Sequence, residues 1–207
     1  MALANYTDLQ AAIASWSFNR TDLPTTDLIT LGETRLNRDL RLRVMETEDE
    51  LSSTTDSREM ALPSDFLAPI ALLRVDSTGR VPMPQLLPIT ATSETAGQPD
   101  FWAIDGANIV FERPADDEYD FVLRYRAKFN LSDASPTNWL LTNHPDAYLS
   151  AALVEAALWA QDDDQASRWQ ARYQAAIDPI LKLEARSRQA ALKTELAAER
   201  GFDINRG

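Results

Sequence analysis

Residues 137–177 carry the strongest structural signal in the sequence, because they predict a hairpin of two packed helices. Apolar side chains recur three and four residues apart in each arm, which places them on one helix face. They are Leu149, Ala152, Leu153, Ala156 and Trp159 or Ala160, then Ala166, Trp169, Tyr173, Ala176, Ile177 and Ile180. Pro145 suits a first helical turn, and the aspartates at 162–164 mark the turn and cap the second arm. The hairpin holds no usable arrangement of reactive side chains, so it indicates assembly rather than chemistry.

The composition is that of a folded, soluble protein. With 207 residues, 44% of them hydrophobic, the chain is long enough to bury a core as one domain. No apolar run approaches the ~20 residues that cross a membrane, and the N-terminus lacks the basic and apolar regions of a signal peptide. We therefore expect a protein made in the cytoplasm. The absence of cysteine excludes disulfides, thiol nucleophiles and zinc sites with sulfur ligands.

The formal net charge of −12 argues against a protein that binds tightly to nucleic acid. Affinity for a phosphate backbone comes from clustered Lys and Arg, and this chain has 20 of these against 32 Asp and Glu. Solubility alone can account for such a charge.

The first 43 residues predict two helices. The first has an apolar face made of Leu9, Ala12, Ile13 and Trp16. After a loop at residues 19–24, the second runs to about residue 43. Gly32 inside it costs about 1 kcal/mol relative to alanine, which indicates that another helix approaches closely at that point.

The second of these helices carries a basic face. It consists of Arg35, Arg38, Arg41 and Arg43. These arginines either pair in solvent with nearby acids, including the run at residues 46–50, or form salt bridges between subunits of a ring. The ring interpretation makes Arg35, Arg38 and Arg41 candidate subunit-interface residues. Trp139, just ahead of the helical hairpin, is either a core residue or lies at the same boundary.

Residues 44–129 change to short β-compatible runs separated by turn residues. The runs are residues 45–52, 58–62, 70–75, 101–104, 108–111 and 121–129. We expect the first two to pair as a hairpin, and Asp105, Gly106 and Ala107 to turn between the fourth and fifth. The last run alternates with a period of two, as in a half-buried strand.

No pattern in the sequence supports catalysis or metal binding. His144 is the only histidine, and no Gly-x-Ser-x-Gly motif accompanies it, so it favours a capping or surface role. The consecutive aspartates at 162–164 lack the alternating spacing of a calcium loop, and the six glycines form no phosphate-binding loop. We expect no catalytic residue, no metal and no cofactor. A glycosidase pair among the 32 carboxylates needs no shared motif and stays open.

The C-terminal residues predict a long helix and a tail. Residues 181–200 are rich in helix formers and Gly201 is a C-cap. Phe202 and Ile204 follow where no local structure can bury them. This end either frays, as termini commonly do, or becomes ordered on a partner.

Two blocks of the chain resemble the head-to-tail adaptor (connector) proteins of tailed bacteriophages. The first contains I-T-L-G-E-T-R-L-N-R-D-L-R within residues 6–60. The second contains N-W-L-L-T-N-H-P-D-A-Y-L, E-A-A-L-W-A-Q-D-D-D and W-Q-A-R-Y-Q-A-A within residues 136–185. The resemblance implies a structural virion protein without enzymatic activity, located in the neck between head and tail. It also implies a ring of twelve copies beneath the portal.

The partners implied by the resemblance are the portal ring, adjacent copies of the chain, and a downstream tail, nozzle or stopper protein, with no membrane. Double-stranded DNA would pass through the ring during ejection without specific binding, because acidic walls repel phosphate. The candidate channel-facing acids are Glu46, Glu48, Asp49, Glu50, Asp116 and Asp117, and the candidate portal-docking residues are Phe202, Ile204 and Arg206. Two other classes stay open, a virion-associated cell-wall hydrolase and a monomeric tail-completion binding module.

The expected fold class is α+β and mainly α. We expect a four-helix bundle with an inserted small antiparallel sheet, followed by a long C-terminal helix and tail. Residues 1–207 would form one adaptor domain, with the bundle at 1–43 and 137–200, the β-rich insertion at 44–130 and the tail at 201–207.

Overall fold

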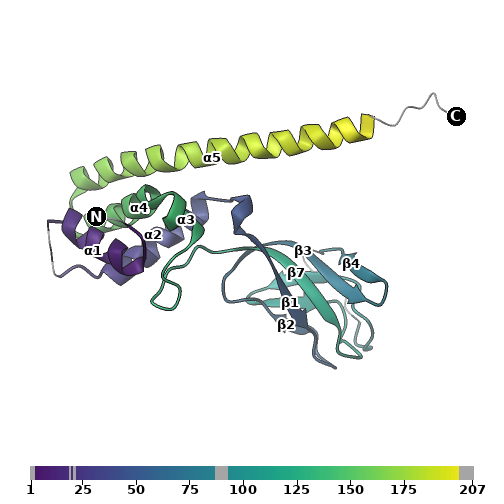
Figure 1. The fold of residues 1–207 in the computed structure, drawn as a ribbon. Helices are drawn as coiled ribbons and strands as arrows, with labels where there is room; N and C mark the ends of the chain where they lie inside the picture. Colours follow the sequence, from purple (N-terminus) through teal and green to yellow (C-terminus); the bar gives the residue numbers. More distant parts are fainter. Residues whose placement is uncertain (1–2, 19, 21, 87–92, 201–207) are drawn as a thin grey trace. The chain divides into compact units, whose positions relative to one another are not determined.

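The computed structural model describes residues 3–18, 20, 22–86 and 93–200 (Figure 1). The chain divides into two compact units. The helical unit contains Met1–Arg43 and Phe129–Gly207, and the β unit contains Val44–Lys128. The prediction that the whole chain acts as one adaptor domain stays a prediction.

The helical unit contains five α-helices within the described residues. They are α1 (Tyr6–Trp16), α2 (Thr25–Asp39), α3 (Trp139–Asn143), α4 (Pro145–Trp159) and α5 (Asp163–Arg200). Helix α4 packs against each of the other four. Ten of its fifteen residues are buried and five of those are alanine, so its neighbours can approach on nearly every side.

Helix α5 is much longer than the helices that it packs against. Its 38 residues span about 57 Å at the usual rise per residue, against about 22 Å for the 15 residues of α4. Among α5 residues 163–188, whose side chains the structure describes, the buried ones are Ala166, Tyr173, Ile177 and Ile180. Beyond them, Arg188 donates to the backbone oxygen of Arg41 at 2.7 Å, so contact with the rest of the unit continues at least to this point.

The turn between α4 and α5 follows the local signals in the sequence. Pro145 occupies the first turn of α4, as predicted. After Gln161, which has a positive φ of 57°, the Asp162 carboxylate accepts a hydrogen bond from the Gln165 N–H at 2.9 Å. The predicted capping of the second arm by the aspartate run is therefore confirmed for Asp162, which satisfies one of the free N–H groups of the first turn.

Helices α2 and α4 meet at Gly32, as the sequence predicted. A Cβ atom at this position would lie 3.1 Å from the backbone nitrogen of Ala152 and 3.3 Å from the carbonyl carbon of Ala151. Since the obstacle is helical backbone and not a flexible side chain, it cannot move aside cheaply. Glycine is needed here for its missing side chain.

The β unit begins with a 3-10 turn, η1 (Arg43–Met45), at its boundary and contains two antiparallel sheets. The four-stranded sheet has the order β1-β7-β3-β4, with β1 (Glu46–Ser52), β7 (Asp120–Ala127), β3 (Phe66–Asp76) and β4 (Gly79–Met83). The three-stranded sheet has the order β2-β6-β5, with β2 (Glu59–Ala61), β6 (Asn108–Phe111) and β5 (Trp102–Asp105).

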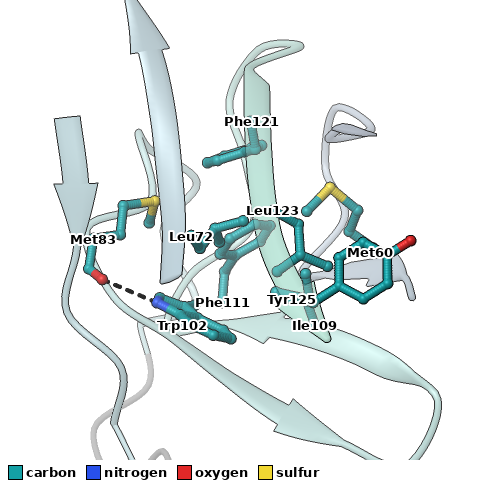
Figure 2. Close-up of a cluster of buried hydrophobic side chains, with 9 residues drawn as sticks. All are labelled: Met60, Leu72, Met83, Trp102, Ile109, Phe111, Phe121, Leu123 and Tyr125. Atoms are coloured by element: carbon teal, nitrogen blue, oxygen red, sulfur yellow. Dashed lines mark hydrogen bonds between the residues drawn. The ribbon is translucent and has the colours of Figure 1, made fainter. Parts of the chain in front are cut away.

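The two sheets bury one shared cluster of side chains, which Figure 2 shows pointing toward one another from both sheets. The cluster consists of Met60, Leu72, Met83, Trp102, Ile109, Phe111, Phe121, Leu123 and Tyr125. The rings of Phe111 and Phe121, one from each sheet, stack with centroids 5.1 Å apart. Buried Trp102 donates its indole N–H to the backbone oxygen of Met83 at 3.0 Å, so its polar atom is satisfied (Figure 2).

The expectation of a mainly α four-helix bundle with one small sheet is wrong. The described residues form an α+β structure with five helices and two sheets, in which the β unit has its own core. The predicted hairpin of residues 45–52 and 58–62 is also wrong, since β1 pairs with β7 and β2 pairs with β6. The predicted hairpin of β5 and β6 is confirmed, with Gly106 at a φ of 59° in its turn.

We expect Gly32→Ala to destabilise the helical unit by about 1–2 kcal/mol. Overpacking against rigid backbone costs about 1–3 kcal/mol, which exceeds the gain of about 1 kcal/mol in helix propensity. The measurement is urea unfolding followed by circular dichroism at the helix band. Thr34→Ala on the exposed side of the same helix is the control, for which we expect a change within about 0.5 kcal/mol. Equal or greater stability of Gly32→Ala would show that the helices can separate without cost.

Candidate interaction surfaces

One end of the helical unit carries a cluster of aromatic and basic side chains, all exposed except the half-buried Trp169, which we call the aromatic surface. It consists of Trp16, Phe18, Arg20, Trp159, Trp169 and Arg172. These residues come from the end of α1, the residues after it, the end of α4 and the start of α5. The folding of α4 and α5 into a hairpin brings the three segments together.

One tilted pair of tryptophan rings and two cation–π contacts order the aromatic surface. The rings of Trp16 and Trp169 lie with centroids 5.6 Å apart. Arg20 lies over the ring of Trp159 at 5.0 Å, and Arg172 over the ring of Trp169 at 4.6 Å. Cation–π contacts at exposed sites contribute about 0.5–1 kcal/mol each, so the surface is held in place without being buried.

Two hollows adjoin the aromatic surface. One, of about 120 Å³, has Leu153 and Ala156 among its lining residues. The other, of about 320 Å³, is lined by Leu149, Asp146 and Arg172 among others. Trp16 and Trp169 line both hollows. The surface is therefore shaped to receive apolar side chains, with one acidic and one basic group beside the larger hollow.

Phe18 is the most unusual residue of this surface. Its side chain is 83% exposed and its backbone has a φ of 60°, in the left-handed region that bulky residues rarely adopt. Neither feature stabilises the isolated chain, since the conformation costs free energy and the ring gains no burial. Sequence reasoning assigned Trp159 and Trp169 to packing stripes and missed this surface. The sequence offered one signal, the density of large aromatics near the predicted turns.

The predicted subunit-interface residues have different environments. Arg35 is held inside the helical unit, with its guanidinium 2.6 Å from a carboxylate oxygen of Glu155 and 3.0 Å from the amide oxygen of Gln170. Arg38 and Arg41 are exposed. Trp139 is 38% exposed, and its ring lies 5.3 Å from that of His144. Among the three arginines, Arg35 is the one for which the described residues show an ion pair.

The predicted channel acids of β1 lie beside arginines of the same sheet. Antiparallel pairing sets Glu46 opposite Arg126 and Glu48 opposite Arg124. The closest oxygen and nitrogen atoms are 3.7 Å apart in the first pair and 3.1 Å in the second, and Arg80 is 2.9 Å from Glu48. These contacts offset the charge of two of the acids, which lowers the local negative potential that they could present to DNA.

The other predicted acids lie at exposed positions. Asp49 and Glu50 follow along β1, while Asp116 and Asp117 precede β7. Asp116 accepts a hydrogen bond from the Tyr119 hydroxyl at 2.7 Å. Their place in a channel stays a prediction. The predicted portal-docking residues Phe202, Ile204 and Arg206 lie outside the described residues.

The described part of the chain shows neither a metal-ligand cluster nor a membrane-spanning helix. No group of three or more His, Cys, Asp or Glu side chains within it is placed to hold a metal ion. No helix among these residues is both long and apolar enough to cross a membrane.

We expect Arg35→Ala to destabilise the helical unit by about 1–3 kcal/mol, because it leaves the partly buried carboxylate of Glu155 without its cation. Arg38→Ala is the matched control on the same helix, and its stability should stay within about 0.5 kcal/mol of the parent protein. Urea unfolding measures both. Equal stability of the two variants would show that the Arg35–Glu155 pair contributes no net stability.

Comparison with known proteins shows which family the sequence of this chain matches. The sequence model of the SU10 adaptor protein family matches residues 4–195, which cover the whole β unit and most of the helical unit. Comparison with curated proteins finds no relative that matches the chain. The family match confirms the predicted resemblance to phage head-to-tail adaptors.

Proposed function

Because the chain belongs to the SU10 adaptor protein family, we propose that it is a structural virion protein that joins the portal to the tail. The match over residues 4–195 is the single observation that carries the proposal. In this role twelve copies form a ring beneath the portal, extend the DNA channel and receive the next tail component. The protein acts through its surfaces and needs no catalytic residue or cofactor.

The aromatic surface supports a ring. Head-to-tail contacts in a cyclic assembly require two different surfaces on each copy. The aromatic surface lies at the C-terminal end of α1, and Trp16 is the last residue of that helix. Trp139 lies near the other end, since Pro136 accepts a hydrogen bond from the N–H of Tyr6, the first residue of α1. We propose that the aromatic surface of one copy meets a surface of the next that includes Trp139, while the exposed Arg38 and Arg41 remain candidates for contacts between copies.

The charge supports DNA passage. With a net charge of −12, the ring as a whole repels phosphate and lets the duplex slide. Among the predicted channel acids, Asp49, Glu50, Asp116 and Asp117 are exposed. We propose these four as the stronger candidates for the channel wall, because arginines partly offset Glu46 and Glu48.

The proposal predicts monomers in isolation and rings on the portal. Analytical ultracentrifugation of the free protein should give a monomer, and electron microscopy after mixing with the cognate portal should show an added ring.

We expect Phe18→Asn to retain the stability of the free chain, because asparagine tolerates a positive φ, and to weaken ring formation at least tenfold. Leu31→Gln, at a half-exposed position of α2, is the control and should assemble normally. Failure of the parent protein to bind the portal would overturn the proposed function, whereas normal assembly by Phe18→Asn would exclude only the aromatic surface.

We also propose that Phe202, Ile204 and Arg206 attach the ring to the portal. Deletion of residues 201–207 should leave the melting temperature of the free protein nearly unchanged and weaken its attachment to the portal. Co-sedimentation with portal rings measures the attachment. Parent-like attachment by the truncated protein would exclude this docking role.

A further inference from the structure

Glu33 carries a buried carboxyl group. Among the described residues, none of the groups that contact it is a cation. Glu33 lies on α2 and is 5% exposed. The hydroxyl of Tyr148 on α4 donates to its Oε1 at 3.1 Å, and the backbone N–H of Leu131 faces the same carboxyl group. Neither donor carries a charge, so ionisation of Glu33 would leave an uncompensated charge inside the helical unit.

A chain of hydrogen bonds connects Glu33 to the start of α3. The amide nitrogen of Asn138 donates to the Tyr148 hydroxyl at 2.6 Å. The amide oxygen of the same residue accepts from the Leu141 N–H at 2.9 Å and so caps α3. With its acceptor lone pair used by Asn138, the Tyr148 hydroxyl has one proton to give, and it gives that proton to Glu33.

Glu33 lies in the middle of a row of contacts that fasten residues 129–136 to the helical unit. One turn further along α2, Asn37 forms two hydrogen bonds with the backbone of Phe129, at 2.9 Å and 2.7 Å. Leu131, whose backbone N–H faces Glu33, is buried. At the other end, the N–H of Tyr6 donates to the oxygen of Pro136 at 2.7 Å. Glu33 is the one titratable side chain in this row.

We propose that the protonation state of Glu33 controls whether residues 129–136 stay closed against the helical unit or open. In its neutral form the carboxyl group is stable in its buried position and the segment stays closed. When Glu33 ionises, opening of the segment becomes more favourable, because water can then solvate the carboxylate. The segment directly follows the last strand of the β unit in the chain, so its opening releases the return connection from that unit.

The sign of the pH dependence follows from the environment of Glu33. Burial raises its pKa from 4.5 to about 7, against the hydrogen bonds from Tyr148 and Leu131, which lower it. Any opened state that hydrates the group returns it toward 4.5. The closed state therefore binds the extra proton between these values, and its advantage, which is complete below pH 4.5, is lost as the pH rises to about 7. The opening equilibrium rises by up to about 300-fold over this interval.

Among the groups that face Glu33, none other changes its protonation state between pH 4.5 and about 7. Burial, together with the nearby charge of Glu33, raises the pKa of the Tyr148 hydroxyl far above its usual range. Asn138 and the backbone of Leu131 do not ionise. Arg35 and Asp39, also on α2, are engaged elsewhere, with Glu155 and with the Tyr173 hydroxyl.

Amide hydrogen exchange tests the proposal on the full-length protein between pH 5 and 8. After correction for the intrinsic rate, exchange at Leu131 should accelerate by more than tenfold across this range in the parent protein. In Glu33→Gln, which keeps the shape and stays neutral, it should be independent of pH. Asp27→Asn removes an exposed carboxylate from the same helix and should behave like the parent.

A carbon-detected NMR titration of the Glu33 carboxyl group in the parent protein needs no variant and tests the premise directly. We expect a midpoint near pH 7. A midpoint below pH 5 would overturn the proposal. So would corrected exchange at Leu131 that does not change with pH in the parent, or that changes equally in Glu33→Gln.

Discussion

The contact between Gly32 and the backbone of α4 determines how near α2 can come to the centre of the helical unit. Because no side chain separates the two helices there, the residues that flank Gly32 on α2 reach their partners directly. Glu33 meets Tyr148, and two residues later Arg35 meets Glu155. Both partners lie on α4, so a wider spacing between the helices would strain or break both contacts.

The same helix organises the polar contacts of the unit through alternate residues. Glu33 and Asn37, one turn apart, hold the segment that returns from the β unit. Arg35 and Asp39, on a neighbouring face, bind α4 and α5. Since Glu33, Arg35, Asn37 and Asp39 serve internal contacts, we propose the partner surfaces at other positions, namely the aromatic surface and the exposed Arg38 and Arg41. This division explains why Arg35, chosen from the sequence as an interface residue, has its contacts within the chain.

In the β unit, the shared core of the two sheets sets which charges are exposed. The alternation of β7 directs Phe121, Leu123 and Tyr125 into the core and leaves Arg124 and Arg126 beside the acids of β1. An acidic strand that looks strongly negative in the sequence is thus partly neutralised by its neighbour. The exposed acids Asp49 and Glu50 on β1, and Asp116 and Asp117 before β7, are therefore the better candidates for a negatively charged surface.

Local features of the sequence determined the helical hairpin, the positions of Pro145 and Asp162, the close approach at Gly32 and the β5–β6 turn. Helical periodicity, capping and tight turns depend on residues within a few positions of one another, so a single sequence reveals them. Strand partners and surface exposure depend on residues distant in the chain. Only the tertiary structure decided that β1 pairs with β7, that two sheets replace one, that Arg35 turns inward and that Phe18 is exposed, because each outcome results from packing that no local pattern encodes.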